Sequence, residues 1–172
     1  MTAPGTEAAS PPGPLTGEAE RMAALARMDG LDFLRAMMAG DLPPPPISQT
    51  LGFTLSHAEP GYAVFTGTPA HAYYNPIGSV HGGWIATLLD SCMACAVQTT
   101  LTGGRAYTTL ELKINYIRAV SAATGPVRAE GRVIHTGGRT ATSEGRLIDA
   151  EGRLLAHGTT TCLVFDPRPA KG

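Results

Sequence analysis

The spacing of apolar side chains predicts strands over much of the chain. The clearest strand is residues 108–118, in which every second side chain is apolar: Leu110, Leu112, Ile114 and Tyr116. This alternation is the period of a strand with one face against the core and one face in water. We therefore expect one face of residues 108–118 to meet the core.

Other runs have the length and residue types of strands and are separated by turn residues: 51–58, 62–68, 127–135, 140–149 and 154–165. The first two flank a Pro-Gly pair and are read as a hairpin. The last three are separated by Gly137-Gly138 and Glu151-Gly152, which predicts a meander of antiparallel strands. The strands thus come as two, then four.

The segment between these two groups, residues 82–101, is apolar on nearly every side. It is long enough to be mistaken for a membrane span, but Asp90 near its centre would cost roughly 2.5–3.5 kcal/mol in a bilayer. We interpret it as a helix buried inside the protein and ended by Gly103-Gly104. The prediction is an α+β domain in which an antiparallel sheet wraps one long central helix.

The N-terminal part of the chain has a different composition. Residues 1–17 are rich in Pro, Gly, Ala and Thr, so we expect a disordered tail. Residues 18–39 lack proline and predict two short helices that break at Asp29-Gly30. The four prolines at 43–46 form a polyproline spacer that ends this helical extension, 18–46. The main domain is then 47–167, with a short tail at 168–172.

Composition narrows the function classes. The 172 residues fit one domain, and a net charge of −1 without a basic stripe makes nucleic acid an unexpected partner. The first thirty residues lack the features of a secretory signal, so a cytoplasmic location is the default. Cys92 and Cys95 form a C-x-x-C, but inside the predicted helix, where core packing is the better interpretation. We expect no metal site and no membrane partner.

Asp90 is the one formally charged side chain in the forty-five residues between Glu59 and Arg105. A buried carboxylate is costly unless it has partners, an elevated pKa or a task that retains it. A structural role and a catalytic role are both open from this observation alone. Ala86 and Ala94, one turn away on either side, leave room for a ligand or another chain.

The loop before the helix, residues 75–83, is the second chemical feature. The N–H groups of Gly82 and Gly83 at a helix start favour negative charge and would stabilise the oxyanion formed when a carbonyl is attacked. The alternative is a plain tight loop in which His81 caps the helix or packs against it.

The spacing of these features resembles a known family. The run NPIGSVHGGWIATLLD is similar to the signature of hotdog-fold acyl-CoA thioesterases of the phenylacetic-acid-degradation type, in the 4-hydroxybenzoyl-CoA thioesterase superfamily. The similarity continues through TLELKINYIRAV to HTGGRTATSEGRLIDAEGRLLAHGTTTCLVF and covers about residues 51–165. It implies a hotdog fold, here with the N-terminal helical extension added.

The resemblance also implies roles for individual residues. Asp90 matches the carboxylate that acts as general base or nucleophile, and Gly82 matches the glycine whose N–H polarises the thioester oxygen. Asn75 lies beside it in the same loop and is expected to bind the carbonyl with it, and His81 takes a positioning role. Thr109 matches a hydroxyl that orients the attacking water, although a one-residue slip would substitute the adjacent threonine.

In this family the loop of one subunit faces the helix of the other, so we expect a homodimer or homotetramer. The substrate, an acyl-CoA, carries a diphosphate and a ribose phosphate that need donors or cations near the pocket mouth. The candidate substrate-binding residues are Gly83, Arg118, Gly138, Arg139 and Thr140, although each of the turn and edge residues fits a solvated surface role equally well. No cofactor is implied.

Two other functions stay open. The hydratase branch of the same fold also binds acyl-CoA, but its Asp and His are spaced differently from Asn75 and Asp90. A non-catalytic acyl-CoA-binding module would keep the pocket without turnover, and such a module would have no need of a carboxylate at position 90. Fold alone does not separate these functions. The sequence leaves the acyl group open as well.

Overall fold

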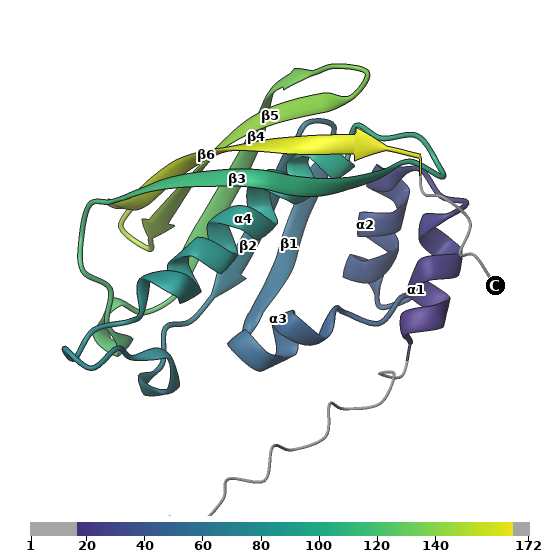
Figure 1. Cartoon of the computed structure of the whole chain (residues 1–172). Coiled ribbons are helices and arrows are strands. Elements are labelled where there is room, and N and C mark those ends of the chain that lie inside the picture. The colour runs from purple at the N-terminus through teal and green to yellow at the C-terminus, as the bar shows by residue number, and fades with distance from the viewer. Residues whose placement is uncertain (1–16, 167–172) are drawn as a thin grey trace, which may run out of the picture.

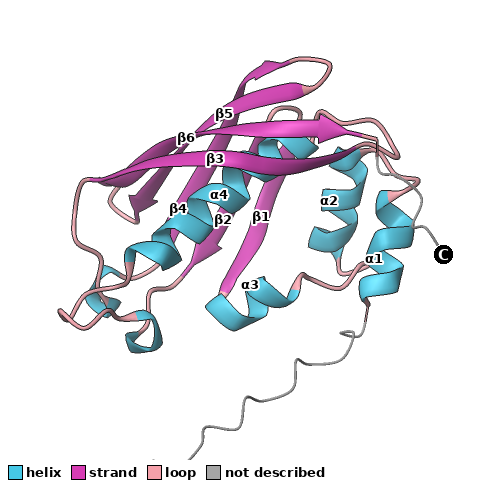
Figure 2. Ribbon diagram, in the orientation of Figure 1, coloured by secondary structure: helices cyan, strands magenta, loops and turns pink. Residues whose placement is uncertain are grey.

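The computed structural model describes residues 17–166 as one six-stranded antiparallel sheet wrapped around a long helix, α4 (Gly82–Gln98) (Figure 1). Figure 2 shows the helix along the concave side of the sheet. This confirms the predicted α+β class and the hotdog architecture. The strands, in their order across the sheet, are β1 (Phe53–Glu59), β2 (Tyr62–Gly67), β4 (Val127–Thr136), β5 (Thr140–Asp149), β6 (Leu154–Phe165) and β3 (Ala106–Tyr116).

The strand pairings confirm the predicted hairpin and meander. Strands β1 and β2 pair from Glu59 with Tyr62 outward, and Gly61 in the turn between them has the positive φ of 73° that glycine tolerates best. β4, β5 and β6 follow one another in the sheet, as expected. β2 pairs with β4, which joins the two strand groups, and β3 pairs with β6 at the opposite edge.

Two glycines let α4 lie close against the sheet. A Cβ on Gly131 of β4 would come 2.2 Å from the Cys92 carbonyl oxygen, and one on Gly145 of β5 would come 2.7 Å from Met93. Ser143 adds a hydrogen bond from its Oγ to the Met93 carbonyl at 3.0 Å. These contacts fix the depth of the helix turn that follows Asp90.

The N-terminal extension contains the two predicted helices, α1 (Glu18–Leu25) and α2 (Gly30–Ala39). Their junction is attached to the end of α4. Gly30 N–H donates to the Leu101 carbonyl at 2.9 Å, and Gly103 N–H donates to the Asp29 carboxylate at 2.7 Å. The extension is therefore packed onto the sheet and helix.

Two element boundaries differ from the prediction. The last of the four prolines, expected in a spacer, begins a third helix, α3 (Pro46–Leu51), and β1 starts only after it. Proline is favoured at a first helical position because its missing N–H has no partner there anyway. Helix α4 ends at Gln98 rather than at residue 101. The hydroxyls of Thr99 and Thr100 bond to carbonyl oxygens of the last turn and compete with further helix.

Burial also departs from the expected pattern in two places. Leu110 is 57% exposed because β3 shifts register between Thr109 and Glu111, so the alternation holds for only part of that strand. Helix α4 is not surrounded on every side either. A stripe that includes Ala86, Thr87 and Asp90 is only half-buried, and it borders the edge strand β3. Residues 1–16 and 168–172, predicted as tails, lie outside the described part of the chain.

None of the helices described in residues 17–166 is long and apolar enough to cross a membrane.

Candidate active site

The start of α4 presents one free N–H group rather than two. His81 is the N-cap residue, and its Nδ1 accepts a hydrogen bond from Gly83 N–H at 2.8 Å. Among residues 17–166, Gly82 N–H has no acceptor. A neutral His81 that accepts at Nδ1 carries its proton on Nε2. Gly82 therefore supplies the amide available to an anion at the N-terminus of this helix.

Asn75 shapes the loop before α4. Its Oδ1 accepts from the N–H groups of Ile77 and Ser79, both at 3.1 Å, and its Nδ2 donates to Ser79 Oγ at 3.1 Å. This uses most of the bonding capacity of the side chain within the turn. Val80 N–H and His81 N–H are held by the carbonyls of Val120 and Tyr73. Asn75, expected to bind the carbonyl directly, is thus placed to act on the position of Gly82 through the loop.

Tyr116, at the end of β3, holds Gly82 from the other side. Its hydroxyl donates to the Gly82 carbonyl at 3.1 Å, and a Cβ at position 82 would lie 3.2 Å from the ring. The alternation of apolar residues predicts that Tyr116 lies on the core face of its strand, but the side chain is 53% exposed. The alternating pattern gave no sign of this contact, because it depends on where the strand end meets the loop.

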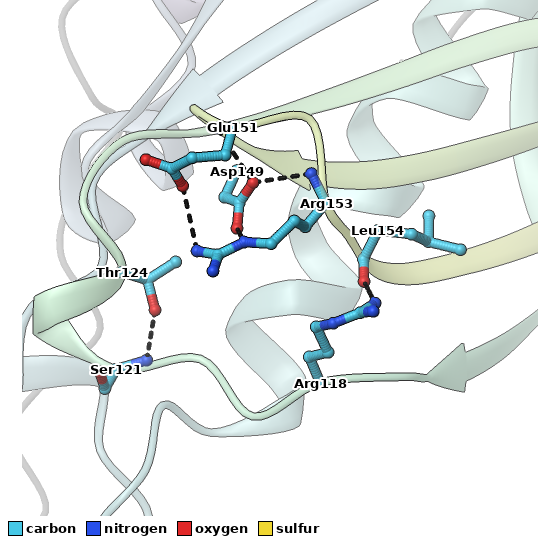
Figure 3. Close-up of polar contacts among 7 residues, drawn as sticks. All are labelled: Arg118, Ser121, Thr124, Asp149, Glu151, Arg153 and Leu154. Carbon is cyan, nitrogen blue, oxygen red and sulfur yellow. Dashed lines mark hydrogen bonds and ion pairs between the residues drawn. The ribbon is translucent and has the colours of Figure 1, made fainter.

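The turn between β5 and β6 is closed by a buried carboxylate (Figure 3). Asp149 accepts from the N–H groups of Glu151 and Arg153 and from Arg153 Nε, the last at 2.6 Å. Burial alone would raise the pKa of Asp149. The hydrogen bonds from Arg153 outweigh that effect and hold the pKa below its ordinary value.

This turn supports the loop that carries Arg118. Arg118 Nη1 donates to the Leu154 carbonyl at 2.5 Å, just after the Asp149 turn (Figure 3). Two residues on, the Val120 carbonyl accepts from Val80 N–H in the loop before α4. Arg118 and Gly82 line the same small cavity of about 240 Å³. The structure therefore places this predicted substrate-binding residue beside the free N–H.

The other predicted substrate-binding group lies at the opposite end of the sheet. Gly138 and Arg139 form the turn between β4 and β5, and Thr140 begins β5. The Gly138 carbonyl accepts from Arg105 Nη2 at 3.0 Å. Strand β5 has ten residues, so its two ends are about 30 Å apart. One protomer does not bring Arg118 together with this turn.

Asp90 lies on the half-buried stripe of α4 and has one hydrogen-bond donor within residues 17–166. Thr109 Oγ1 donates to Asp90 Oδ1 at 2.9 Å. The contact distinguishes the two adjacent threonines, since Thr108 makes no such bond. The second carboxylate oxygen of Asp90 is left for a water or a substrate.

A cavity of about 720 Å³ opens beside Asp90, and we name it the Asp90 cavity. Its wall comes from α4, from β1, β2 and β3, and from residues 37–48 of the N-terminal extension. Of the described residues that line it, Asp90 alone carries a formal charge. The carboxylate thus faces an otherwise neutral and largely apolar space.

Cys95 also lines the Asp90 cavity but is unsuited to act as a nucleophile. Burial raises the pKa of its thiol to about 12 and outweighs the lowering by a hydrogen bond with Tyr107, while the negative charge of Asp90 adds a smaller increase. The thiolate is the reactive form of cysteine. At neutral pH Cys95 therefore stays a thiol, and Asp90 is the stronger candidate in this cavity.

Asp90 and Gly82 of one chain cannot act on the same carbonyl. They are eight residues apart on one helix, which corresponds to about 12 Å along its axis. A catalytic carboxylate and an oxyanion donor must each lie about 3 Å from the reacting group. A site that used both groups would therefore take Asp90 from one chain and Gly82 from another.

Residues 17–166 contain no group of three or more His, Cys, Asp or Glu side chains arranged to hold a metal ion.

Comparison with known proteins agrees with this architecture. The family model described as Thioesterase superfamily matches residues 77–156, which include most of the loop before α4, the helix itself and strands β3, β4 and β5. A phenylacetic acid degradation-related protein from Ralstonia eutropha JMP134 is 30% identical, with a TM-score of 0.69. The match covers 76% of this chain and 98% of that chain.

Two further solved structures are similar at the same level. Conserved protein PA5202 from Pseudomonas aeruginosa is 32% identical with a TM-score of 0.66, over 71% of this chain and 95% of that one. A mutant of the phenylacetic acid degradation protein PaaI from Thermus thermophilus is 31% identical with a TM-score of 0.63, over 69% and 98%. No curated protein matches the sequence. With nearly the whole of these relatives covered, the chain belongs to the thioesterase superfamily and is a hotdog-fold thioester hydrolase of the PaaI type.

Proposed function

We propose that this hydrolase cleaves the thioester of an acyl-CoA to a free acid and CoA, with Asp90 as the catalytic carboxylate. The observation that carries the proposal is the lone carboxylate, held by a single hydrogen bond, in the neutral Asp90 cavity. Its free oxygen either takes a proton from the attacking water or attacks the thioester carbon itself. Thr109, which donates to the other oxygen, keeps the carboxylate in place.

Gly82 N–H is the proposed oxyanion donor. Attack on the thioester carbon moves negative charge onto its oxygen, and a fixed N–H at a helix start stabilises that charge without reorganising. His81 and Asn75 serve this step indirectly, since they hold the helix start and the loop. The CoA thiolate then leaves without a strong general acid.

The active unit is proposed to be a homodimer or a larger homo-oligomer, with each site shared between two chains. The separation of Gly82 and Asp90 on one helix supports this, as does the exposed apolar surface near the edge strand β3. Leu110 and Ile117 there are 57% and 48% exposed. A second copy placed on this edge would cover them.

The CoA moiety is proposed to bind through two groups of residues. Arg118 lies beside Gly82 and provides a cation at the mouth of that loop. Gly138, Arg139 and Thr140 offer a second set of donors about 30 Å away in the same chain. In a shared site these two sets would come from different subunits. The cytoplasmic location expected from the sequence stays a prediction.

The direct test is release of free thiol from a panel of acyl-CoAs by the purified protein. Turnover of at least one acyl-CoA is expected. An acyl-CoA that binds without any thiol release would support the non-catalytic module instead. Addition of water to an enoyl-CoA, with no thiol released, would support the hydratase.

The shared site has its own test with two variants that damage different halves. Asp90→Asn removes the carboxylate, and Gly82→Pro removes the N–H at a helix position where proline is favoured. Co-expressed, each mixed dimer keeps one intact site, so thiol release should return. Absence of rescue in confirmed mixed dimers, or a fully active monomer in light scattering, would contradict the shared site.

A further inference from the structure

The N-terminal extension forms a fixed part of the domain. Phe33, Leu34 and Leu42 are buried in one cluster together with Ala58 of β1. The contact at Gly30 is closer still, since a Cβ there would lie 1.9 Å from the Gln98 carbonyl oxygen of α4. Figure 1 shows α2 and α3 beside β1, and both helices contact that strand. Such packing holds the extension in one place relative to Asp90.

The extension also lines the Asp90 cavity. Met37 and Met38 come from α2, Ile47 comes from α3, and the prolines between the two helices complete this side of the wall. Family similarity begins at about residue 51 in the sequence, and the family model begins at residue 77. This side of the wall therefore lies ahead of the segment that the family model matches.

The chemistry of the wall restricts what the cavity accepts. Apart from Asp90, its described lining residues carry no formal charge. A carboxylate on the far end of an acyl group would leave water without a cationic partner and would be repelled by Asp90. A volume of about 720 Å³ falls in the range of small-molecule pockets, so it holds much more than an acetyl group.

We infer that residues 37–48 form the specificity wall for the acyl group, and that the cavity selects an uncharged, apolar acyl group larger than acetyl. The inference rests on the proposed acyl-CoA hydrolysis. Met38 is the position at which to change the selection. It lines the cavity yet is 41% exposed, so a lysine there can keep its apolar stem in place and present a charge to the cavity rim.

The test compares two thioethers that the enzyme cannot hydrolyse, S-octyl-CoA and S-(7-carboxyheptyl)-CoA, by calorimetric titration of the full-length protein. The natural protein should bind S-octyl-CoA at least about tenfold more tightly than S-(7-carboxyheptyl)-CoA. Met38→Lys should reduce the ratio of the two dissociation constants by about tenfold or more, because the lysine ammonium group pairs with the carboxylate of S-(7-carboxyheptyl)-CoA. Met22→Lys is the matched control, on an α1 residue that is 61% exposed and does not line the cavity.

The outcomes separate this inference from the proposed function. Equal binding of the two thioethers to the natural protein, or equal effects of Met38→Lys and Met22→Lys, would overturn the specificity wall. Selective binding of S-octyl-CoA together with no thiol release from any acyl-CoA of the panel would support the wall and overturn the proposed hydrolysis. A folding defect in Met38→Lys is detected by its melting temperature, and Ile47→Lys then provides a second test at the same wall.

Discussion

The start of α4 and its middle are built in opposite ways. Around Gly82, the backbone carbonyl, the adjacent N–H groups and the preceding loop have hydrogen-bond partners from Tyr116, His81 and Asn75. Two turns further along the same helix, the Asp90 side chain accepts one hydrogen bond within residues 17–166, from Thr109, and it borders an apolar cavity.

This difference follows from what each region is proposed to do. A donor that stabilises an oxyanion works best when fixed in advance, because no reorganisation is then needed during the reaction. A general base or nucleophile must keep an oxygen free for its reacting partner. Dense hydrogen bonding around Gly82 and sparse hydrogen bonding around Asp90 therefore fit complementary parts of one reaction.

The largest effect is expected from Asp90→Asn, which removes the carboxylate and keeps its size. A positioned general base contributes about 10²–10⁴-fold, so kcat should fall by at least that range. The melting temperature should hold or rise, because a neutral amide is cheaper to bury than a carboxylate. The kcat and the melting temperature are measured on one preparation of the variant. A lower melting temperature with activity that follows the folded fraction would assign Asp90 a structural role.

At the start of α4, Gly82→Pro removes a single N–H group. Loss of one oxyanion donor typically costs about 10²–10³-fold in kcat. Gly82→Ala is the control, because it brings a Cβ equally close to Tyr116 but keeps the N–H. Its kcat should stay within about tenfold of the natural enzyme. Equal losses in the two variants would show that crowding, and not the missing donor, causes the effect.

Thr109→Val tests the single hydrogen bond that holds the Asp90 carboxylate. The variant loses the hydrogen bond at 2.9 Å, and a bond to a charged group is worth about 1.5–3 kcal/mol. Since Asp90 keeps its own reactivity, kcat should fall only by about tenfold. Thr109→Ser keeps the hydroxyl and should restore most of the rate. A serine variant no better than the valine variant would remove Thr109 from the mechanism.

The smallest effect on catalysis is expected from Glu130→Gln, on the face of β4 that points away from α4. Glu130 accepts from Arg128 Nε and Arg146 Nε, both at 2.7 Å. Burial tends to raise the pKa of Glu130, but these two hydrogen bonds outweigh it and lower that pKa. The stability that the carboxylate contributes is thus present at neutral pH, above the ordinary glutamate pKa of about 4.3, and is lost as pH falls through the lowered value.

Glu130→Gln should therefore lower the melting temperature at pH 7, while kcat/KM stays unchanged. The difference in melting temperature between the variant and the natural protein should become smaller as the pH is lowered. Glu144→Gln, at an exposed position of the neighbouring strand β5, is the control and should leave the melting temperature alone. A change in kcat/KM with Glu130→Gln would mean that the far face of the sheet also contributes to the site.

The α+β class, the hairpin, the strands of the meander and the central helix could all be predicted from the sequence, because apolar periodicity and glycine or proline turns are local signals. The sequence also singled out Asp90, since a lone charge in a long neutral stretch is visible without a structure. Helix α3 could not be predicted in this way, because in the sequence a proline at a first helical position looks the same as a proline in a spacer.

Features that depend on residues far apart in the sequence became visible only in the folded chain. The pairing of β3 with β6, the contact of Tyr116 with Gly82, and the capping of Gly83 by His81 join or orient parts that no local pattern connects. Periodicity predicts which face of an element is apolar but not which neighbour covers it. For the same reason, only the folded chain places Met38 beside the Asp90 cavity, because that position depends on how the extension packs over β1.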